Sequence, residues 1–410
     1  MHTGRAVGPS GDDWSIERPL RAPCAPDSSA HSRAPRQRRT HPYTPPMPAR
    51  TPTESNRLLL DYRAEAARLP RLPYPIHDCH THINGDHAAR IYREARDLYG
   101  ASFTYSQTQL QHLGTVRAAL GGSVRFVAIP DYSSQDRATA LTSGLIDTIS
   151  RWHAEGARMV KFWCAPRGRE LGRDAGDVRL LTLDNPWRRR HMDHAASLGM
   201  AFMVHVADPD TWFRTKYADA SFFGTKASHY EPLERLADEY RAVPWLVAHM
   251  GGWPEDLRFL DGLLTRQPNL HLDTSATKWI VRELSRHPTP EVVAFFTKWK
   301  HRIVFGTDIV TSESHVGGPS TGGPPVQHTV TTPEGAFDLY ASRYWALRVM
   351  FETDHEGESP IADPDLALVE PDRHHGMSAP LLKGHRLPAP VLRAIYHDTP
   401  RALFDPVYAR

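Results

Sequence analysis

The stretch IHDCHTH at residues 76–82 decides how this chain folds. It starts with an apolar residue and ends with two histidines that stand two positions apart, as expected at the end of a β-strand. Because side chains alternate between the two faces of a strand, His80 and His82 point the same way. Two neutral imidazoles placed in this manner form half of a metal site. The chain contains 24 histidines, so the pair gains weight only when similar residues end other strands.

Three further strand-like runs end in a residue type that a metal site requires. His205, His249 and Asp308 end the runs MVH, LVAH and VFGTD. Three imidazoles from this set, together with the carboxylate, suit Zn²⁺, and they would also accept Mn²⁺, Co²⁺ or Fe²⁺. Any one of these residues could be a buried side chain with an ordinary hydrogen-bond partner. Five of them at matching strand ends favour a metal site over packing.

Apolar runs recur along the chain with the spacing of an alternating β/α protein. Eight are present, at residues 76–83, 101–105, 124–130, 158–163, 200–206, 245–250, 270–274 and 302–309. The segments between them are mostly long enough for a crossover helix, and one such helix is predicted to start at Asn185-Pro186 and to stop at Gly199. This pattern predicts an α/β fold, a (β/α)8 TIM barrel of parallel strands. The strand-end residues then meet at the carboxyl end of the barrel, where active sites form.

The region 311–390 departs from the alternation. Its Gly-Pro-rich sequences indicate loops, a helical pattern follows around residues 336–351, and a helix over residues 389–404 closes the chain. We therefore expect a long insertion after strand eight. Long loops at this end of a barrel are more often functional than idle.

The composition narrows the classes of partner and compartment. The 410 residues include 49 basic and 47 acidic ones, and a net charge of +2 gives no reason to expect a nucleic acid or an anionic membrane as partner. No run approaches the roughly 20 apolar residues of a membrane span. Three cysteines are too few for a disulfide framework. We expect a cytoplasmic protein that acts on a small molecule.

Residues 1–55 differ from the rest, because Pro, Arg, Ser and Thr dominate there. Such a segment buries too little apolar surface to offset the entropy lost on ordering. We expect residues 1–55 to be a disordered N-terminal extension and residues 56–410 to form the folded domain. Met47 is an alternative start of translation.

Taken together, the strand-end motifs resemble those of the amidohydrolase superfamily. The resemblance rests on Asp78-x-His80-x-His82, His205, His249 followed by Gly251-Gly252, and Gly306-Thr307-Asp308. They are more closely similar to the amidohydrolase-related branch that includes aminocarboxymuconate-semialdehyde decarboxylase, and the resemblance covers about residues 56–410.

The resemblance implies a division of roles among these residues. His80, His82, His205 and Asp308 become ligands of one divalent metal, with zinc the expected ion. His249 becomes the catalytic acid, base or electrophile, and Asp308 binds the metal, accepts a proton from the water, or does both. Relatives in this branch are often dimers, which implies a homodimer.

Lys161 and three residues that follow strands four, five and seven are candidates for binding the substrate. Lys161 is placed to point into the barrel mouth. There it could bind a substrate carboxylate, become carboxylated and bridge two metals as in binuclear amidohydrolases, or form a structural ion pair. Arg167, Trp212 and Trp279 lie on loops that form the mouth. The expected substrate is acidic or contains a carbonyl group.

These observations favour a metal-dependent hydrolase that cleaves an amide, lactone or ester-like bond with a metal-activated water, while His249 and Asp308 transfer protons. The alternative is a metal-dependent decarboxylase of a small aromatic or unsaturated acid. A third interpretation is a non-catalytic barrel that binds a ligand, against which the intact ligand set argues.

Overall fold

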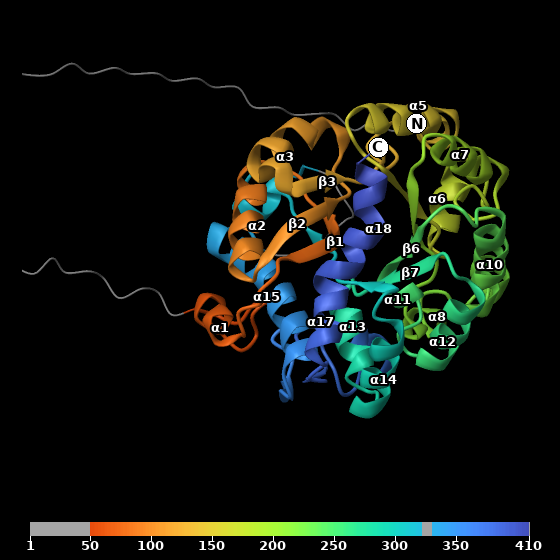
Figure 1. Cartoon of the computed structure of the whole chain (residues 1–410). Coiled ribbons are helices and arrows are strands. Elements are labelled where there is room, and N and C mark those ends of the chain that lie inside the picture. The colour runs from red at the N-terminus through yellow and green to blue at the C-terminus, as the bar shows by residue number, and fades with distance from the viewer. Residues whose placement is uncertain (1–49, 322–329, 410) are drawn as a thin grey trace, which may run out of the picture. The chain divides into compact units, whose positions relative to one another are not determined.

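Parallel strands alternate with helices through the computed structural model, which describes residues 50–321 and 330–409 (Figure 1). The strands of this alternating part are β1 (Ile76–His82), β2 (Ala101–Ser106), β3 (Val124–Phe126), β4 (Met159–Trp163), β5 (Ala201–His205), β6 (Trp245–Val247), β7 (Leu270–Asp273), β8 (Ile303–Val304) and β9 (Ile309–Val310). Each of the eight predicted apolar runs contains a strand, and the eighth contains two. The prediction of an α/β fold with parallel strands is confirmed.

The helices lie between the strands and in the carboxyl-terminal part of the chain. They are α1 (Tyr62–Arg68), α2 (His87–Leu98), α3 (Leu113–Leu120), α4 (Arg137–Ala140), α5 (Ser143–Ala154), α6 (Gly168–Asp174), α7 (Pro186–Ser197), α8 (Asp210–Arg214), α9 (Ala220–Phe223), α10 (Tyr230–Glu239), α11 (Ala248–Gly251), α12 (Leu257–Arg266), α13 (Thr277–Leu284), α14 (Thr289–Trp299), α15 (Pro333–Glu352), α16 (Asp365–Val369), α17 (Ala389–Arg393) and α18 (Thr399–Tyr408). Two short strands, β10 (Glu356–Glu358) and β11 (Leu381–Lys383), pair antiparallel.

The ends of α7 show how local sequence sets a helix. Oδ1 of Asn185 accepts a hydrogen bond from the Trp187 N–H at 2.9 Å, and proline occupies the first turn. Gly199, with a φ of 70°, follows the helix in the left-handed region that glycine adopts most readily. The predicted start and stop of this helix are confirmed.

The strands form two parallel sheets, with the orders β3-β2-β1-β9 and β4-β5-β6-β7-β8. Backbone hydrogen bonds connect these sheets on both sides. Ala128, which follows β3, donates to the carbonyl of Met159 and accepts from the N–H of Lys161, each at 2.8 Å. On the other side, the Cys79 N–H donates to the carbonyl of Phe305 at 2.9 Å. The carboxyl ends of the strands therefore lie side by side.

The eighth run is interrupted because its middle residues serve the site rather than the sheet. A Cβ atom on Gly306 would lie 3.0 Å from the Cβ of His80, so a larger residue would press on that histidine. Asp308 has a φ of 62°, an uncommon conformation for a residue with a side chain. Its N–H donates to the carbonyl of His80 at 2.8 Å, and β9 then pairs with the end of β1.

The side chains on the inner faces of the strands form an apolar cluster of their own. It consists of Cys79, Tyr105, Val127, Met159, Ala201, Met203, Leu246, Val304, Phe404 and Val407. The last two residues belong to α18, which crosses this region in Figure 1, and the rings of Tyr105 and Phe404 are 4.8 Å apart. A second, larger cluster fills the space between strands and helices. Helical periodicity contributes to it: α2 buries Ile91, Tyr92 and Ala95 in this cluster.

The helix predicted around residues 336–351 is α15. It begins at Pro333 with Thr332 as its N-cap, and every residue from Ala336 to Phe351 is buried. Because the helix is enclosed, its polar side chains need partners in the protein. The hydroxyl of Tyr344 donates to Oδ2 of Asp78 at 2.7 Å. This helix is thus part of the core and reaches β1 directly.

The folded unit already includes residues 50–55, which the sequence placed in the N-terminal extension. Ser55 is buried, and its carbonyl accepts from the Tyr62 hydroxyl at 2.8 Å. The carbonyl of Glu54 accepts from the Ala362 N–H at 2.7 Å. The rest of the predicted extension, residues 1–49, lies outside the described residues.

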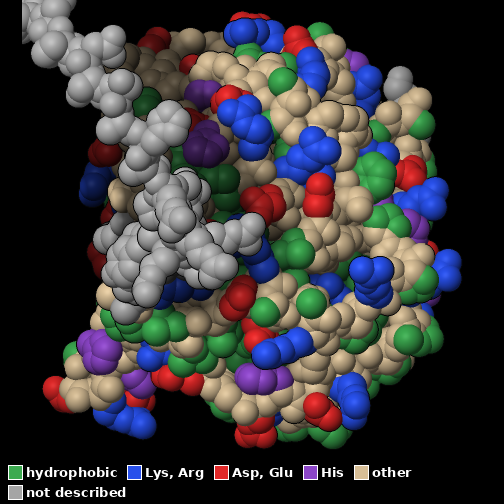
Figure 2. Space-filling view, turned by 90° about the vertical axis from the view of Figure 1, so that its left-hand side faces the viewer, with side chains coloured by type: hydrophobic (Ala, Val, Ile, Leu, Met, Phe, Trp, Pro, Cys, Tyr) green, Lys and Arg blue, Asp and Glu red, His purple; other side chains and the backbone are tan. Residues whose placement is uncertain are grey.

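Acidic and basic side chains are interspersed on the face shown in Figure 2, in keeping with the nearly balanced composition. Among the helices within residues 50–321 and 330–409, none has the length and apolar character needed to cross a membrane.

One buried histidine makes the stability of this fold depend on pH. His77 is 2% exposed, stacks on Phe103 with 4.6 Å between ring centroids, and has no hydrogen-bond partner for either ring nitrogen among the described residues. Burial, followed by the neighbouring His397, lowers its pKa from 6.5 to about 3. Between these two values the unfolded chain takes up a proton that the folded chain does not. Stability therefore falls as the pH falls through this window.

We predict that His77→Phe keeps the stacked ring and removes this dependence. The loss in free energy of unfolding between pH 6.5 and 4 should be smaller by about 3 kcal/mol in the variant, because the window spans more than two pH units and each unit corresponds to about 1.4 kcal/mol. Urea denaturation at the two pH values measures it, with exposed His301→Phe as the control. Equal losses in His77→Phe and the wild type would show that His77 does not cause the effect.

Candidate metal centre

The first strand departs from strict alternation where it reaches the site. Its register against β2 shifts between Asp78 and Thr81. As a result Cys79 enters the inner apolar cluster, and the next residue, His80, also meets side chains of the inner face. The expectation that successive residues of this strand face opposite ways therefore fails at Cys79 and His80, whereas His80 and His82 do point toward the same group.

His80 lies at the middle of the group of polar side chains at the strand ends. It is fully buried, and its Nδ1 lies 2.8 Å from Oδ2 of Asp273. Its Nε2 lies 3.3 Å from Nζ of Lys161 and 3.5 Å from Oδ1 of Asp308. Burial, followed by the charge of Lys161, lowers the pKa of His80, so the imidazole is neutral at physiological pH.

His80, His82 and Asp308 offer ligand atoms that all lie within 4.8 Å of one another. Nε2 of His82 is 3.2 Å from Oδ1 of Asp308. Burial opposes the ionisation of Asp308, but the hydrogen bond from His82 and the neighbouring His80 outweigh it and hold the pKa below its usual range. Two imidazole nitrogens and an ionised carboxylate are a donor set for a divalent transition metal. The three residues fit such an ion.

Asp273, at the end of β7, is the central residue that sequence reasoning missed. Its Oδ2 binds His80, and its Oδ1 accepts from the backbone N–H groups of His249 at 2.8 Å and of Ser275 at 3.0 Å. The Ser275 hydroxyl also contacts Oδ1. Burial alone would raise the pKa of Asp273, but His80 and the other partners lower it below its usual range. The signal was available, because Asp273, a metal-binding residue type, is the penultimate residue of the run at residues 270–274.

The hydrogen bonds of Ser275 set the tautomer of His249. An ionised carboxylate can only accept, so the Ser275 hydroxyl donates to Asp273. Its oxygen then accepts from Nδ1 of His249 at 2.7 Å. The same reasoning gives His80 its proton on Nδ1, which faces Asp273. Nε2 of each imidazole therefore keeps its lone pair.

His249 is held in place by its backbone as well as by its ring. It has a φ of 58°, and its ring centroid lies 5.0 Å from that of His80. Burial lowers its pKa well below the ordinary value, and the nearby His205 lowers it further. The site thus contains a neutral imidazole with an unprotonated Nε2, which is the form of a general base.

Asp78 positions the segment that carries Asp308. Its Oδ1 accepts from the Thr307 N–H at 3.0 Å, and its Oδ2 accepts from the Thr307 hydroxyl and the Tyr344 hydroxyl, each at 2.7 Å. The carboxyl group is fully buried, and burial raises its pKa to about 7. Its close partners are Thr307 and Tyr344, so Asp78 fixes the segment before Asp308 against β1 and α15.

Lys161 brings a cationic side chain to the centre. It is 4% exposed, and burial lowers its pKa to about 8, although the carboxylates of Asp273 and Asp308 act in the opposite direction. No carboxylate oxygen among the described residues lies within the 4.0 Å ion-pair distance of its Nζ. The structural ion pair, one of three roles considered for Lys161, is therefore not formed within the part of the chain described.

His205 lies beside the group without joining the three-residue cluster. Its ring centroid is 4.5 Å from that of His249, and its Nε2 is 2.9 Å from Oδ1 of Asp208. Oδ2 of Asp208 accepts from the Tyr217 hydroxyl at 2.8 Å. Ligation of a metal through Nε2 would require His205 to give up Asp208.

Trp279 is the aromatic residue that reaches the centre. Its ring centroid is 6.3 Å from that of His249, and its indole N–H donates to Oε1 of Glu255 at 3.0 Å. It therefore forms part of the wall beside the candidate base.

Arg167 and Trp212 are engaged elsewhere. Arg167 is exposed, and its Nε lies 3.4 Å from Oε2 of Glu170 on the same surface turn. The indole N–H of Trp212 donates to Oδ2 of Asp365 at 2.7 Å, which ties α8 to α16. The structure shows no contact of either side chain with the centre among the described residues.

A protein-family model described as an amidohydrolase matches residues 77–405. A comparison with curated proteins finds no significant match.

Several solved structures are similar to the chain at low identity. One is a probable 2-pyrone-4,6-dicarboxylic acid hydrolase from Acinetobacter baumannii with citric acid bound (12% identity, TM-score 0.41, covering 80% of this chain and 99% of that one). Another is dihydroorotase from Campylobacter jejuni, with 10% identity and a TM-score of 0.42; the match covers 81% of this chain and 83% of that one. A third is 2,6-dihydroxybenzoate decarboxylase from Rhizobium, with 14% identity and a TM-score of 0.35; the match covers 81% of this chain and 99% of that one. The reaction of this chain has to be inferred from the side chains of its site.

We predict that Asp273→Asn lowers the affinity for a divalent metal by roughly 10- to 100-fold, because the carboxylate orients His80 and sets its tautomer. Competition with a chromophoric chelator measures the affinity. Asp238→Asn on the exposed face of α10 removes the same charge far from the network and serves as the control. A melting curve establishes that the variant is folded, and unchanged affinity in folded Asp273→Asn would contradict the role given to Asp273.

Proposed function

Because the chain belongs to the amidohydrolase family, we propose that it is a metal-dependent hydrolase that cleaves an amide, lactone or ester-like bond. The observation that carries this proposal is the pairing of a metal-binding cluster, His80, His82 and Asp308, with a neutral His249 whose Nε2 has a free lone pair. A hydrolase needs both parts: a cation that activates the reactants and a base that takes a proton from water.

The proposal includes a closed (β/α)8 barrel with a long insertion after strand eight. The hydrogen bonds of Ala128 and Cys79 across the two sheet boundaries support closure. The ring of strands that contribute to one inner apolar cluster supports it as well. In such a barrel the loops at the carboxyl ends of the strands surround the centre.

We propose His80, His82, Asp308 and His205 as the ligands of one divalent ion, with zinc as the preferred ion. A divalent metal bound there supplies a Lewis acid that polarises a carbonyl group and lowers the pKa of water. His80 and Asp273 form the histidine–carboxylate pair that commonly orients a metal ligand. His205 is the fourth ligand in this proposal, since its imidazole lies next to His249 and partly open to solvent.

His249 is the proposed catalytic base. Nδ1 donates to Ser275, which leaves Nε2 to take a proton from the attacking water and to return it to the leaving group. Burial keeps this imidazole neutral, so Nε2 is unprotonated. Asp308 can share the proton, since its carboxylate lies beside His82 and His80.

Lys161 is the proposed binding group for an acidic or carbonyl-containing substrate. With a pKa of about 8 it is mostly protonated at neutral pH, and it stands 3.3 Å from the metal-facing nitrogen of His80. Trp279 supplies an apolar wall on the side of His249. The other role considered for Lys161 is a carbamate that bridges two metals. The number of metals bound per chain decides between substrate binding and metal bridging.

We predict that the metal-replete protein holds about one transition metal per chain. His249→Asn should keep it and lose roughly 10²- to 10⁴-fold in turnover, because that residue serves as the base. His205→Asn should lose the metal itself. Plasma emission on the dialysed proteins gives the metal content. Equal metal loss in the two variants would make His249 a ligand, and two metals per chain in the wild type would indicate a carboxylated Lys161.

We predict hydrolysis in a panel of lactones, amides and hydroxybenzoate-like acids assayed in ¹⁸O-labelled water. A hydrolase places the label in the product carboxylate and releases no CO₂. Stoichiometric CO₂ from an acid substrate, without turnover of any lactone or amide, would overturn the proposal and make the protein a decarboxylase. His249→Asn is the negative control for either reaction.

A further inference from the structure

A second polar pocket lies at the ends of β4 and β5, apart from the metal centre. It has a volume of about 180 Å³. Cys164 follows β4, Val206 follows β5, and the remaining lining comes from the segments 169–184 and 228–232. None of its lining residues belongs to the metal centre.

Two arginines at this pocket lack a counterion. Arg169 lines the pocket, and its Nε is buried without a hydrogen-bond partner among the described residues. Arg188 is 2% exposed, has an unpartnered Nε as well, and interacts with the thiol of Cys164 in the pocket wall. Neither forms an ion pair with any residue in ranges 50–321 and 330–409. Arg188 donates to the Trp163 carbonyl at 3.5 Å, and its guanidinium lies 5.2 Å from the centroid of the Phe162 ring. A buried cation without a counterion is costly.

The charges around the pocket do not balance. A third arginine, Arg179, donates to Oδ2 of Asp184 at 2.8 Å. Asp184 is thus the one carboxylate among the lining residues, beside the guanidinium groups of Arg169 and Arg179, and Arg188 lies behind Cys164. His229 adds no charge, since burial lowers its pKa and its Nε2 faces the Phe223 carbonyl at 3.0 Å. The pocket is therefore short of negative charge.

The hydroxyl groups of the pocket are suited to an acceptor-rich ligand. Thr182 and Ser228 line it, and their oxygens sit at 2.8 Å and 2.7 Å from backbone carbonyls of Arg179 and Thr225. Both hydroxyls can turn their protons from these carbonyls toward a bound oxygen atom. Guanidinium groups present several N–H donors in a planar fork that matches an oxyanion.

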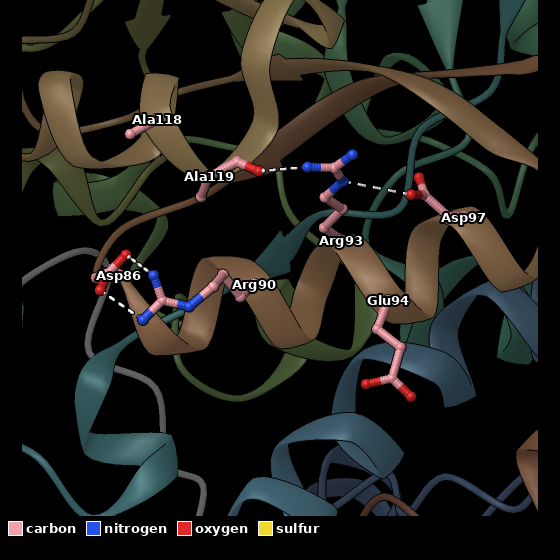
Figure 3. A pocket seen from close by; sticks show the side chains of 7 residues that line it. All are labelled: Asp86, Arg90, Arg93, Glu94, Asp97, Ala118 and Ala119. Atoms are coloured by element: carbon pink, nitrogen blue, oxygen red, sulfur yellow. Dashed lines mark hydrogen bonds and ion pairs between the residues drawn. The ribbon is translucent and has the colours of Figure 1, made fainter.

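In a larger hollow elsewhere, the arginines are paired with carboxylates. The hollow of about 440 Å³ beside α2 is lined by Arg90 and Arg93 together with acidic residues (Figure 3). Arg90 pairs with Asp86, and Arg93 lies 3.5 Å from Asp97. Its arginines form ion pairs with carboxylates, whereas Arg169 and Arg188 form none within residues 50–321 and 330–409.

We propose that the pocket formed by Arg169, Arg179, Thr182 and Ser228, with Arg188 behind Cys164, binds a small oxyanion, either an inorganic one or the carboxylate of a small organic acid. Its volume is below the roughly 300 Å³ at which pockets for drug-sized ligands begin, so the ligand is small. The site goes beyond the proposed hydrolysis and does not depend on it.

Isothermal titration calorimetry on the full-length, metal-loaded protein tests the site with two probes, sulfate and succinate. We expect saturable binding of about one anion per chain. Tighter binding of sulfate identifies an inorganic oxyanion as the ligand, and tighter binding of succinate identifies an organic acid. No saturable binding of either probe would overturn the proposal.

Variants locate the binding. Arg169→Gln should weaken the preferred anion at least 10-fold, while Arg173→Gln, an exposed arginine on the same helix, should leave it unchanged. Arg179→Gln gives the same test if Arg169→Gln does not fold. Wild-type affinity in a folded pocket variant would place the anion elsewhere, for example at the metal, and would overturn the proposal.

Discussion

The carboxylate of Asp273 is the interaction on which the centre depends. It is fully buried and accepts hydrogen bonds from the His80 ring, the His249 backbone, and the backbone and hydroxyl of Ser275. A carboxylate buried away from solvent is tolerated only when hydrogen-bond donors occupy its oxygen lone pairs. These same bonds fix the protons of two imidazoles, so one buried charge sets both the orientation and the tautomer of the catalytic side chains.

Backbone conformation supports this arrangement at three strand ends. Of the non-glycine residues with positive φ among those described, His249, Met250, Ala276 and Asp308 lie within four residues of the ends of β6, β7 and β8. Each such conformation costs on the order of 1 kcal/mol and persists only where the surroundings determine it. Here the surroundings are buried hydrogen bonds, including those of Asp78 to Thr307. The strain is offset by the core and places side chains that an ordinary strand end would direct elsewhere.

Positive charge is distributed unevenly near the strand ends. Lys161 stands against the centre without a close carboxylate, and Arg169 and Arg188 stand behind β4 without one. Surface arginines such as Arg90 are paired. A negatively charged substrate or ion would compensate the charges of Lys161, Arg169 and Arg188. The same lack of carboxylates therefore underlies both the acidic substrate proposed for the centre and the anion proposed for the pocket.

Local sequence alone determined the strands, the limits of α7, the presence of α15 and the strand-end histidines. Hydrophobic period, capping residues and chain order are local properties. Only the tertiary structure decided which side chains meet. It joined Asp273 to His80 across 193 positions, paired His205 with Asp208, and turned Arg167 to the surface. It also broke the alternation at Asp78–Thr81 and split the eighth run around Gly306, because His80 occupies the space that a regular strand would need. Periodicity carries no information about such long-range contacts, which depend on the packing of strands far apart in the chain.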